Sequence, residues 1–129
     1  DVDIAYKTPK ILHDAGVLFC LDYEGDMERM GARNLPFTAG TSVAYGLSKE
    51  EALMSITLNA AKILTVDKTV GSLEEGKDAT LIVSEGDALD VISNNISLAF
   101  IRGKKLDLNN HQIDLFNKYK KRHKEFSEE

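Results

Sequence analysis

Residues Val70 to Asp90 read V-G-S-L-E-E-G-K-D-A-T-L-I-V-S-E-G-D-A-L-D, and this stretch decides which fold we expect. Gly71 permits a turn, and a second turn follows at Glu75-Gly76-Lys77-Asp78, where the glycine is free to adopt positive φ. Ala79–Val83 is then a short apolar run bounded by turn residues, which predicts a strand. Taken by itself, the pattern therefore predicts a short strand between two tight turns.

Downstream of this stretch, the pattern predicts a small antiparallel arrangement followed by a helix. Leu98–Ile101 is expected to be a second strand, Arg102-Gly103-Lys104 a tight reversal, and Lys105–Leu108 a short third strand. Asn109 or Asn110 is expected to cap the final helix. The buried stripe of that helix is expected to consist of Ile113, Leu115, Phe116 and Tyr119.

Upstream, the chain begins with the pattern of a helix followed by a buried strand. Tyr6–Ala15 is expected to be a short helix that ends at Gly16. Val17–Leu21 is a continuous apolar run, which is typical of a strand buried on both faces in a parallel α/β sheet. Asp22 lies at the carboxyl end of that strand, where catalytic groups project in (β/α) barrels.

Two further helices are expected before the central stretch. Phe37–Tyr45 is the first, weakened by Gly40. Ser48–Leu64 is the second, and it begins with a capping box formed by Ser48 and Glu51. Its apolar face is expected to consist of Leu53, Ile56, Ala60 and Ile63, which recur at helical spacing.

The central stretch closely resembles the G-x-L-x-x-G-K-D-A-D-L-[IV]-[IV] segment near the C-terminus of imidazolonepropionase-like, metal-dependent amidohydrolases. The resemblance extends from about Gly16 to Tyr119. It implies an α/β fold in which this chain is the C-terminal fragment of a (β/α)8 barrel enzyme. Residues 1–66 would be the last strand and helices of the barrel, residues 67–108 strands of a small composite β-sandwich domain, and residues 109–129 a C-terminal helix.

The same resemblance implies an activity for the full-length protein, namely hydrolysis of a non-peptide carbon–nitrogen bond in a cyclic amide or imidazolone-like small molecule. In the family, the eighth barrel strand ends in an Asp that takes a proton from metal-bound water and returns it to the leaving nitrogen. Asp22 matches that position and is the predicted catalytic residue. Leu21 departs from the pattern, because the family usually has a small hydroxyl residue there.

The family's metal ligands have no counterpart in this sequence. The resemblance implies a divalent metal, most often zinc, held by an H-x-H motif and further histidines on earlier strands. The chain has only His13, His111 and His123, and none of them forms such a motif. Because catalytic zinc usually takes three protein ligands, we expect no metal site in this chain alone. We therefore expect the fragment to be inactive without the rest of the amidohydrolase chain.

The polar segment Tyr23–Pro36 is long for a connection in an α/β fold, and it contains a cluster of carboxylates at Glu24, Asp26 and Glu28. A solvated loop is the simplest interpretation. The alternative is a cover over the substrate site, in which Arg29 or Arg33 binds an anionic group.

Composition excludes several classes of function. The formal net charge of −5 argues against a nucleic-acid partner, and no apolar run approaches the roughly 20 residues that would span a bilayer, so no membrane partner is expected. A single cysteine, Cys20, forms no internal disulfide and is expected to be a buried, unreactive thiol. It leaves the redox compartment, and with it the localisation, undecided.

Two alternatives to a catalytic fragment stay open. One is a non-catalytic structural or assembly domain of a degenerate amidohydrolase relative, which Leu21 favours. The other is a small-ligand binding module that uses the Tyr23–Pro36 segment. In addition, an isolated barrel strand has two unpaired edges, so we expect self-association, rearrangement, or mobility near Val17–Pro36.

Overall fold

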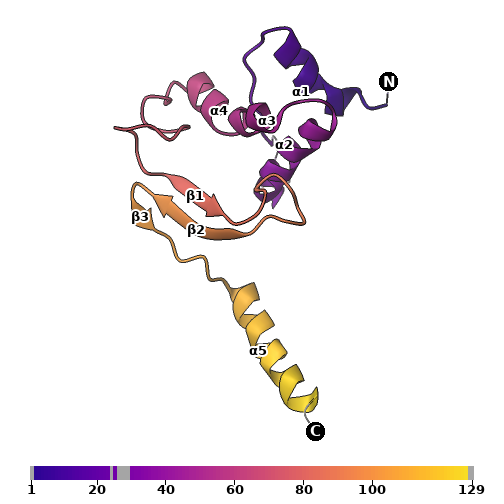
Figure 1. The fold of residues 1–129 in the computed structure, drawn as a ribbon, viewed down its shortest axis with the longest axis vertical. Helices are drawn as coiled ribbons and strands as arrows, with labels where there is room; N and C mark the ends of the chain where they lie inside the picture. The colour runs from indigo at the N-terminus through magenta and orange to yellow at the C-terminus, as the bar shows by residue number, and fades with distance from the viewer. Residues whose placement is uncertain (1, 24, 26–29, 128–129) are drawn as a thin grey trace.

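The computed structural model describes residues 2–23, 25 and 30–127, which form a helical part, a small sheet and a separate C-terminal helix (Figure 1). The elements in chain order are α1 (Ile4–Asp14), the 3-10 helix η2 (Ala32–Asn34), α2 (Leu35–Ala44), α3 (Lys49–Ser55), α4 (Leu58–Ile63), β1 (Leu81–Ser84), β2 (Ile96–Ile101), β3 (Lys104–Lys105) and α5 (His111–Ser127). The expected mixture of helices and strands is therefore confirmed. None of the described helices has the length and apolar character needed to cross a bilayer.

Helix α1 confirms the first expected helix, but the strand expected after it is wrong. Gly16 has φ +69 and its N–H donates to the His13 carbonyl, so the helix ends as expected. Residues 17–21 are neither helix nor strand, and the side chains of Val17 and Leu18 are 48% and 51% exposed. All strand pairing in the described residues is among β1, β2 and β3, so no strand pairs with this segment. A strand needs neighbouring strands to satisfy its backbone groups, and none of the described strands lies beside residues 17–21.

Instead, the 17–21 segment is attached to a break between two helices. The expected single helix over residues 48–64 is wrong, because it is divided into α3 and α4 at Thr57, whose φ of −130 and ψ of −92 are not helical. The break frees the Ser55 carbonyl, which accepts the Leu21 N–H at 3.1 Å. The hydroxyl groups of Ser55 and Thr57 donate to carbonyls of the preceding turn, and such bonds compete with a regular helix.

The buried face of these helices also differs from the expected one. Leu53 and Ile63 are 45% and 44% exposed, whereas small side chains of α3 and α4 are buried: Ala52, Ser55 and Ala61. The core cluster consists of Ala39, Leu47, Ala52 and Leu89, with partly buried Phe19, Leu21, Val43 and Ile56 packed around it. The core therefore sits between α2, α3 and the loop that contains Leu89.

The sheet is antiparallel in the order β1-β2-β3, and its first two strands confirm the strands expected from the central stretch. Leu81 pairs with Phe100 and Ile82 with Ala99. Arg102 and Gly103 both have positive φ, as a two-residue hairpin turn requires. The third strand is shorter than expected, because β3 consists of Lys104–Lys105 alone. The Leu106 N–H still donates to the Ala99 carbonyl of β2 at 2.9 Å, but residues 106–108 are not part of the strand.

Helix α5 begins as expected, because the Asn110 side chain accepts the Ile113 N–H at 3.0 Å. Its expected burial is wrong. Within the described residues it packs on no other helix or strand, and it extends away from the sheet in Figure 1. The apolar residues expected to be buried are all exposed: Ile113, Leu115, Phe116 and Tyr119.

Candidate functional site

Asp22, the predicted catalytic residue, lies at the end of the irregular 17–22 segment and is exposed. One of its carboxylate oxygens accepts the N–H of Tyr23 at 2.7 Å. The Tyr23 hydroxyl lies 2.7 Å from the Thr38 hydroxyl, which connects this point of the chain to α2. The carboxylate is thus presented next to the helical core rather than enclosed by it.

Of the two arginines predicted to bind substrate, the structure describes Arg33. Arg33 lies in η2 and is exposed, and the hydrogen bonds and ion pairs of the described residues do not connect it to Asp22. Arg29 lies outside the described residues. The carboxylates Glu24, Asp26 and Glu28 also lie outside them.

Two of the chain's three histidines lie in different helices, α1 and α5. His13 of α1 contacts Glu51 of α3, with 2.6 Å between Nε2 and Oε1, and His111 begins α5. His13 and Glu51 line a hollow of about 280 Å³ together with Val17, Leu18 and Phe19. No group of three or more His, Cys, Asp or Glu side chains in the described part of the chain is arranged to hold a metal ion.

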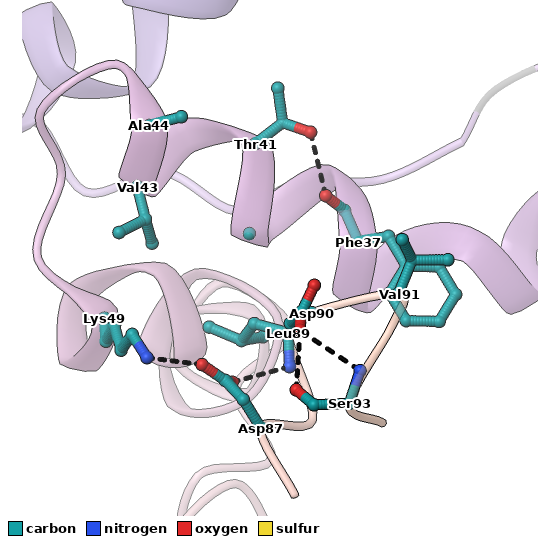
Figure 2. Close-up of a pocket in the computed structure, with 11 residues that line it drawn as sticks. Phe37, Thr41, Val43, Ala44, Lys49, Asp87, Leu89, Asp90, Val91 and Ser93 are labelled. Atoms are coloured by element: carbon teal, nitrogen blue, oxygen red, sulfur yellow. Dashed lines mark hydrogen bonds and ion pairs between the residues drawn. The ribbon is translucent and has the colours of Figure 1, made fainter. Parts of the chain in front are cut away.

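A larger hollow of about 670 Å³ lies between α2 and the loop of residues 85–95 (Figure 2). We call it the Leu89 hollow. Its lining is mainly apolar, with carboxylates and a lysine at one side: Phe37, Gly40, Thr41, Val43, Ala44, Lys49, Asp87, Leu89, Asp90, Val91 and Ser93. Such a lining suits an apolar group that carries positive charge at its edge.

Asp87 is the first of two aspartates that shape the wall of the Leu89 hollow. It forms an ion pair with Lys49 of α3, with 2.5 Å between Oδ2 and Nζ, and its other oxygen accepts the Leu89 N–H at 2.9 Å. These two bonds hold the pKa of Asp87 below its ordinary value, and the bond from Lys49 has the larger effect. Bonding to the same carboxylate raises the pKa of Lys49. The charges on both partners are thereby favoured.

Asp90 is the second of these aspartates. Its carboxylate accepts the Ser93 hydroxyl at 2.6 Å, the Ser93 N–H at 3.1 Å and the Ile92 N–H at 3.3 Å. The bond from the Ser93 hydroxyl is the main reason why the pKa of Asp90 is lowered. Both carboxylates are thus negatively charged at neutral pH and line a mainly apolar hollow (Figure 2).

The sequence pattern did not predict this hollow, because the turn residues that follow Val83 indicate only where a strand ends. A signal was nevertheless present in D-A-L-D-V-I-S over residues 87–93. Aspartates often accept backbone N–H groups two or three residues further on, so this spacing indicates a folded loop rather than an irregular one. Nothing in the spacing shows that the loop packs on α2.

Comparison with known proteins identifies the class to which this chain belongs. A sequence model described as the amidohydrolase family matches residues 6–110. The fold agrees, since an amidohydrolase structure from Thermotoga maritima superposes with a TM-score of 0.68 at 31% identity, covering 79% of this chain and 26% of that one. The chain is therefore a member of the amidohydrolase family.

Among individual proteins, it is similar to the imidazolonepropionase of Thermoplasma volcanium, with 30% identity over 120 residues, covering 83% of this chain and 30% of that protein. It is also similar to the imidazolonepropionase of Picrophilus torridus, with 32% identity over 90 residues, covering 65% of this chain and 21% of that protein. A prolidase solved with N-methylphosphonate-L-proline superposes with a TM-score of 0.58 at 26% identity, covering 79% of this chain and 26% of that one. The chain thus spans less than a third of the length of these relatives.

Proposed function

We propose that this chain is the C-terminal portion of a metal-dependent hydrolase that cleaves a non-peptide carbon–nitrogen bond in a cyclic amide or imidazolone-like small molecule. The observation that carries the proposal is the family match over residues 6–110, together with the similarity to two imidazolonepropionases. Residues 1–66 would complete a (β/α)8 barrel and residues 67–108 a small β-domain. Both would then be assembled with polypeptide outside this chain.

The catalytic role proposed for this chain is that of a proton carrier at Asp22. Its carboxylate would take one proton from the attacking water while the oxygen bonds to the substrate carbonyl carbon. It would return that proton to the nitrogen as the carbon–nitrogen bond breaks, so it ends in its starting state. Exposure at the end of the 17–22 segment supports this role, because the carboxylate is accessible to groups supplied from elsewhere.

The described residues do not fit the divalent metal, most often zinc, that the family resemblance implies. They contain no cluster of three or more possible ligands, and His13 is already bonded to Glu51. The metal would therefore be held by residues other than the described ones, such as those of the family's earlier barrel strands.

The test is a substitution in the polypeptide that carries this chain together with its barrel partner segments. Asp22→Asn keeps the size of the side chain but removes its basicity, and we expect kcat/KM for imidazolonepropionate to fall by about 10²–10⁴-fold. Asp107→Asn is the matched control, because Asp107 is also exposed and accepts a local backbone N–H, at 2.9 Å from Asn109. Equal activity of both variants and the parent would refute the role of Asp22.

A second candidate is a non-catalytic assembly domain of a degenerate relative. The observation that favours it is Leu21, because the family usually has a small hydroxyl residue at this position. Leu21 packs beside the core, and its N–H donates to the Ser55 carbonyl. Under this alternative, the zinc-loaded parent protein has no hydrolytic activity on imidazolonepropionate and related cyclic amides. The same assay thus separates the two candidates before any variant is made.

A further inference from the structure

Helix α5 follows the part of the chain that the amidohydrolase family model matches. The family match ends at residue 110, and α5 begins at His111. At 3.6 residues per turn, Leu115, Phe116 and Tyr119 lie along one side of the helix. Phe116 and Tyr119 are 62% and 53% exposed although they are aromatic. Among the described residues α5 packs on no other helix or strand, so this exposed aromatic stripe indicates a surface for binding.

Basic side chains flank this stripe on both sides. Lys118 and Arg122 lie beside Leu115 on the helical projection, and Lys120 lies beside Phe116, with its ammonium group 5.5 Å from the centre of the aromatic ring. Residues 111–127, the span of α5, contain five Lys or Arg and two Asp or Glu, which gives a formal charge of +3. The partner of α5 should therefore offer an apolar surface bordered by negative charge.

The rest of the chain has that character. Residues 1–110 contain 11 Lys or Arg and 17 Asp or Glu, which gives a formal charge of −6. The lining of the Leu89 hollow is mainly apolar and also includes Asp90 and the Asp87–Lys49 ion pair, so its charged groups sum to one negative charge. Val91 on its wall is 68% exposed, so the apolar surface there is accessible. The negative charge of residues 1–110 complements the positive charge of α5, and the apolar lining of the Leu89 hollow complements its aromatic stripe.

We propose that α5 of one copy of this chain docks into the Leu89 hollow of a second copy, and that the exchange is reciprocal. Phe116 and Tyr119 would occupy the apolar lining, and Lys120 would lie near Asp90. A reciprocal contact closes a two-fold dimer, which buries the helix stripe and the hollow of both copies. An anionic membrane is the less favourable partner, because the −6 body would be repelled from it.

The first test measures the dimer itself by sedimentation velocity and light scattering of the full chain over a wide concentration range. We expect a concentration-dependent dimer that weakens as salt is added. Phe116→Asp should weaken the dimer at least about tenfold, a change of about 1.4 kcal/mol in binding. Asn117→Asp, one residue along and outside the stripe, is the matched control and should leave the dimer intact.

The second test concerns the hollow. Val91→Lys places a positive charge on its wall and should also weaken the dimer about tenfold, because the approaching helix is basic. Ile92→Lys is the control, since Ile92 is 90% exposed and does not line the hollow. Both positions are exposed, so neither change should prevent folding, which circular dichroism would verify.

Three outcomes would overturn the proposal. The first is a monomer at every concentration, because α5 would then not bind a second copy of the chain. The second is a dimer whose affinity is the same in Phe116→Asp as in Asn117→Asp, and the same in Val91→Lys as in Ile92→Lys. The third is binding of the chain to phosphatidylserine vesicles that competes with dimerisation and is lost in Phe116→Asp but kept in Val91→Lys, because α5 would then be a lipid-binding helix.

Discussion

Leu89 lies against Gly40 so closely that a Cβ atom on residue 40 would sit 2.1 Å from the Leu89 carbonyl oxygen. Gly40 is in the middle of α2, and Leu89 belongs to the loop between β1 and β2. Leu89 is also 8% exposed and contributes to the core cluster. This pair therefore attaches the β1–β2 loop to the helices, and it explains why a glycine occurs where it weakens a helix.

Replacing Gly40 with Ala should destabilise the protein even though alanine is the better helix former. The added methyl group would overlap backbone atoms of Leu89, and overpacking of this kind costs about 1–3 kcal/mol. Urea unfolding followed by circular dichroism measures the loss. Thr41→Ala, one residue along on the exposed side, is the control and should stay within about 0.5 kcal/mol of the parent. A Gly40→Ala variant as stable as that control would contradict the close contact.

Shortening Leu89 to Ala tests the other side of the same contact. Removing a buried leucine side chain typically costs about 2–5 kcal/mol, because transfer energy is lost and a cavity is left. Leu73→Ala is the matched control, since Leu73 is 81% exposed and its removal should change the free energy of unfolding by less than about 0.5 kcal/mol. Similar losses at both positions would show that Leu89 is not a core residue.

Features that depend on neighbouring residues were predictable from the sequence. The capping box of Ser48 and Glu51 is present with both of its hydrogen bonds, and Gly16 ends α1 with positive φ. The strands around Leu81 and Phe100 also occur where turn residues and apolar runs place them. In each case a few adjacent side chains determine the backbone conformation, so local pattern is sufficient.

Features that depend on distant partners were not predictable in this way. The apolar run Val17–Leu21 has the composition of a buried strand, but a strand forms only when neighbouring strands accept its hydrogen bonds. The described chain provides the Ser55 carbonyl instead, which accepts the Leu21 N–H. The Leu89 hollow is a similar case, because it depends on contact between Gly40 and a residue 49 positions away. No local pattern contains that information.

The capping box itself should make a measurable contribution to stability. The Ser48 hydroxyl accepts the Glu51 N–H at 3.2 Å, which satisfies a donor at the start of α3. Ser48→Ala removes that acceptor and should lower the free energy of unfolding by about 0.5–2 kcal/mol. Ser48→Asp restores an acceptor and should recover most of the loss in the same urea titration. If the two variants were equally unstable, the hydroxyl would not be acting as a cap.

Stability should fall in acid, and Glu51 should account for part of the fall. The pKa of Glu51 lies below its ordinary value of 4.5, chiefly because of the Ser48 hydroxyl and next because of the Ser48 N–H. The charges of His13 and Lys10 make smaller contributions. A carboxyl group whose pKa is lower in the folded chain contributes its full stabilisation above the unfolded value. That contribution is lost as the pH falls through the folded value.

The window for this loss therefore begins near pH 4.5 and extends below it. Glu51→Gln removes the titrating group while keeping an oxygen that can accept the Ser48 N–H. The free energy of unfolding of this variant, measured by urea titration at successive pH values, should decline less steeply in that window than that of the parent. Some decline should remain, because the pKa values of Asp87 and Asp90 are lowered as well. Parallel curves for parent and variant would show that protonation of Glu51 does not weaken the folded chain.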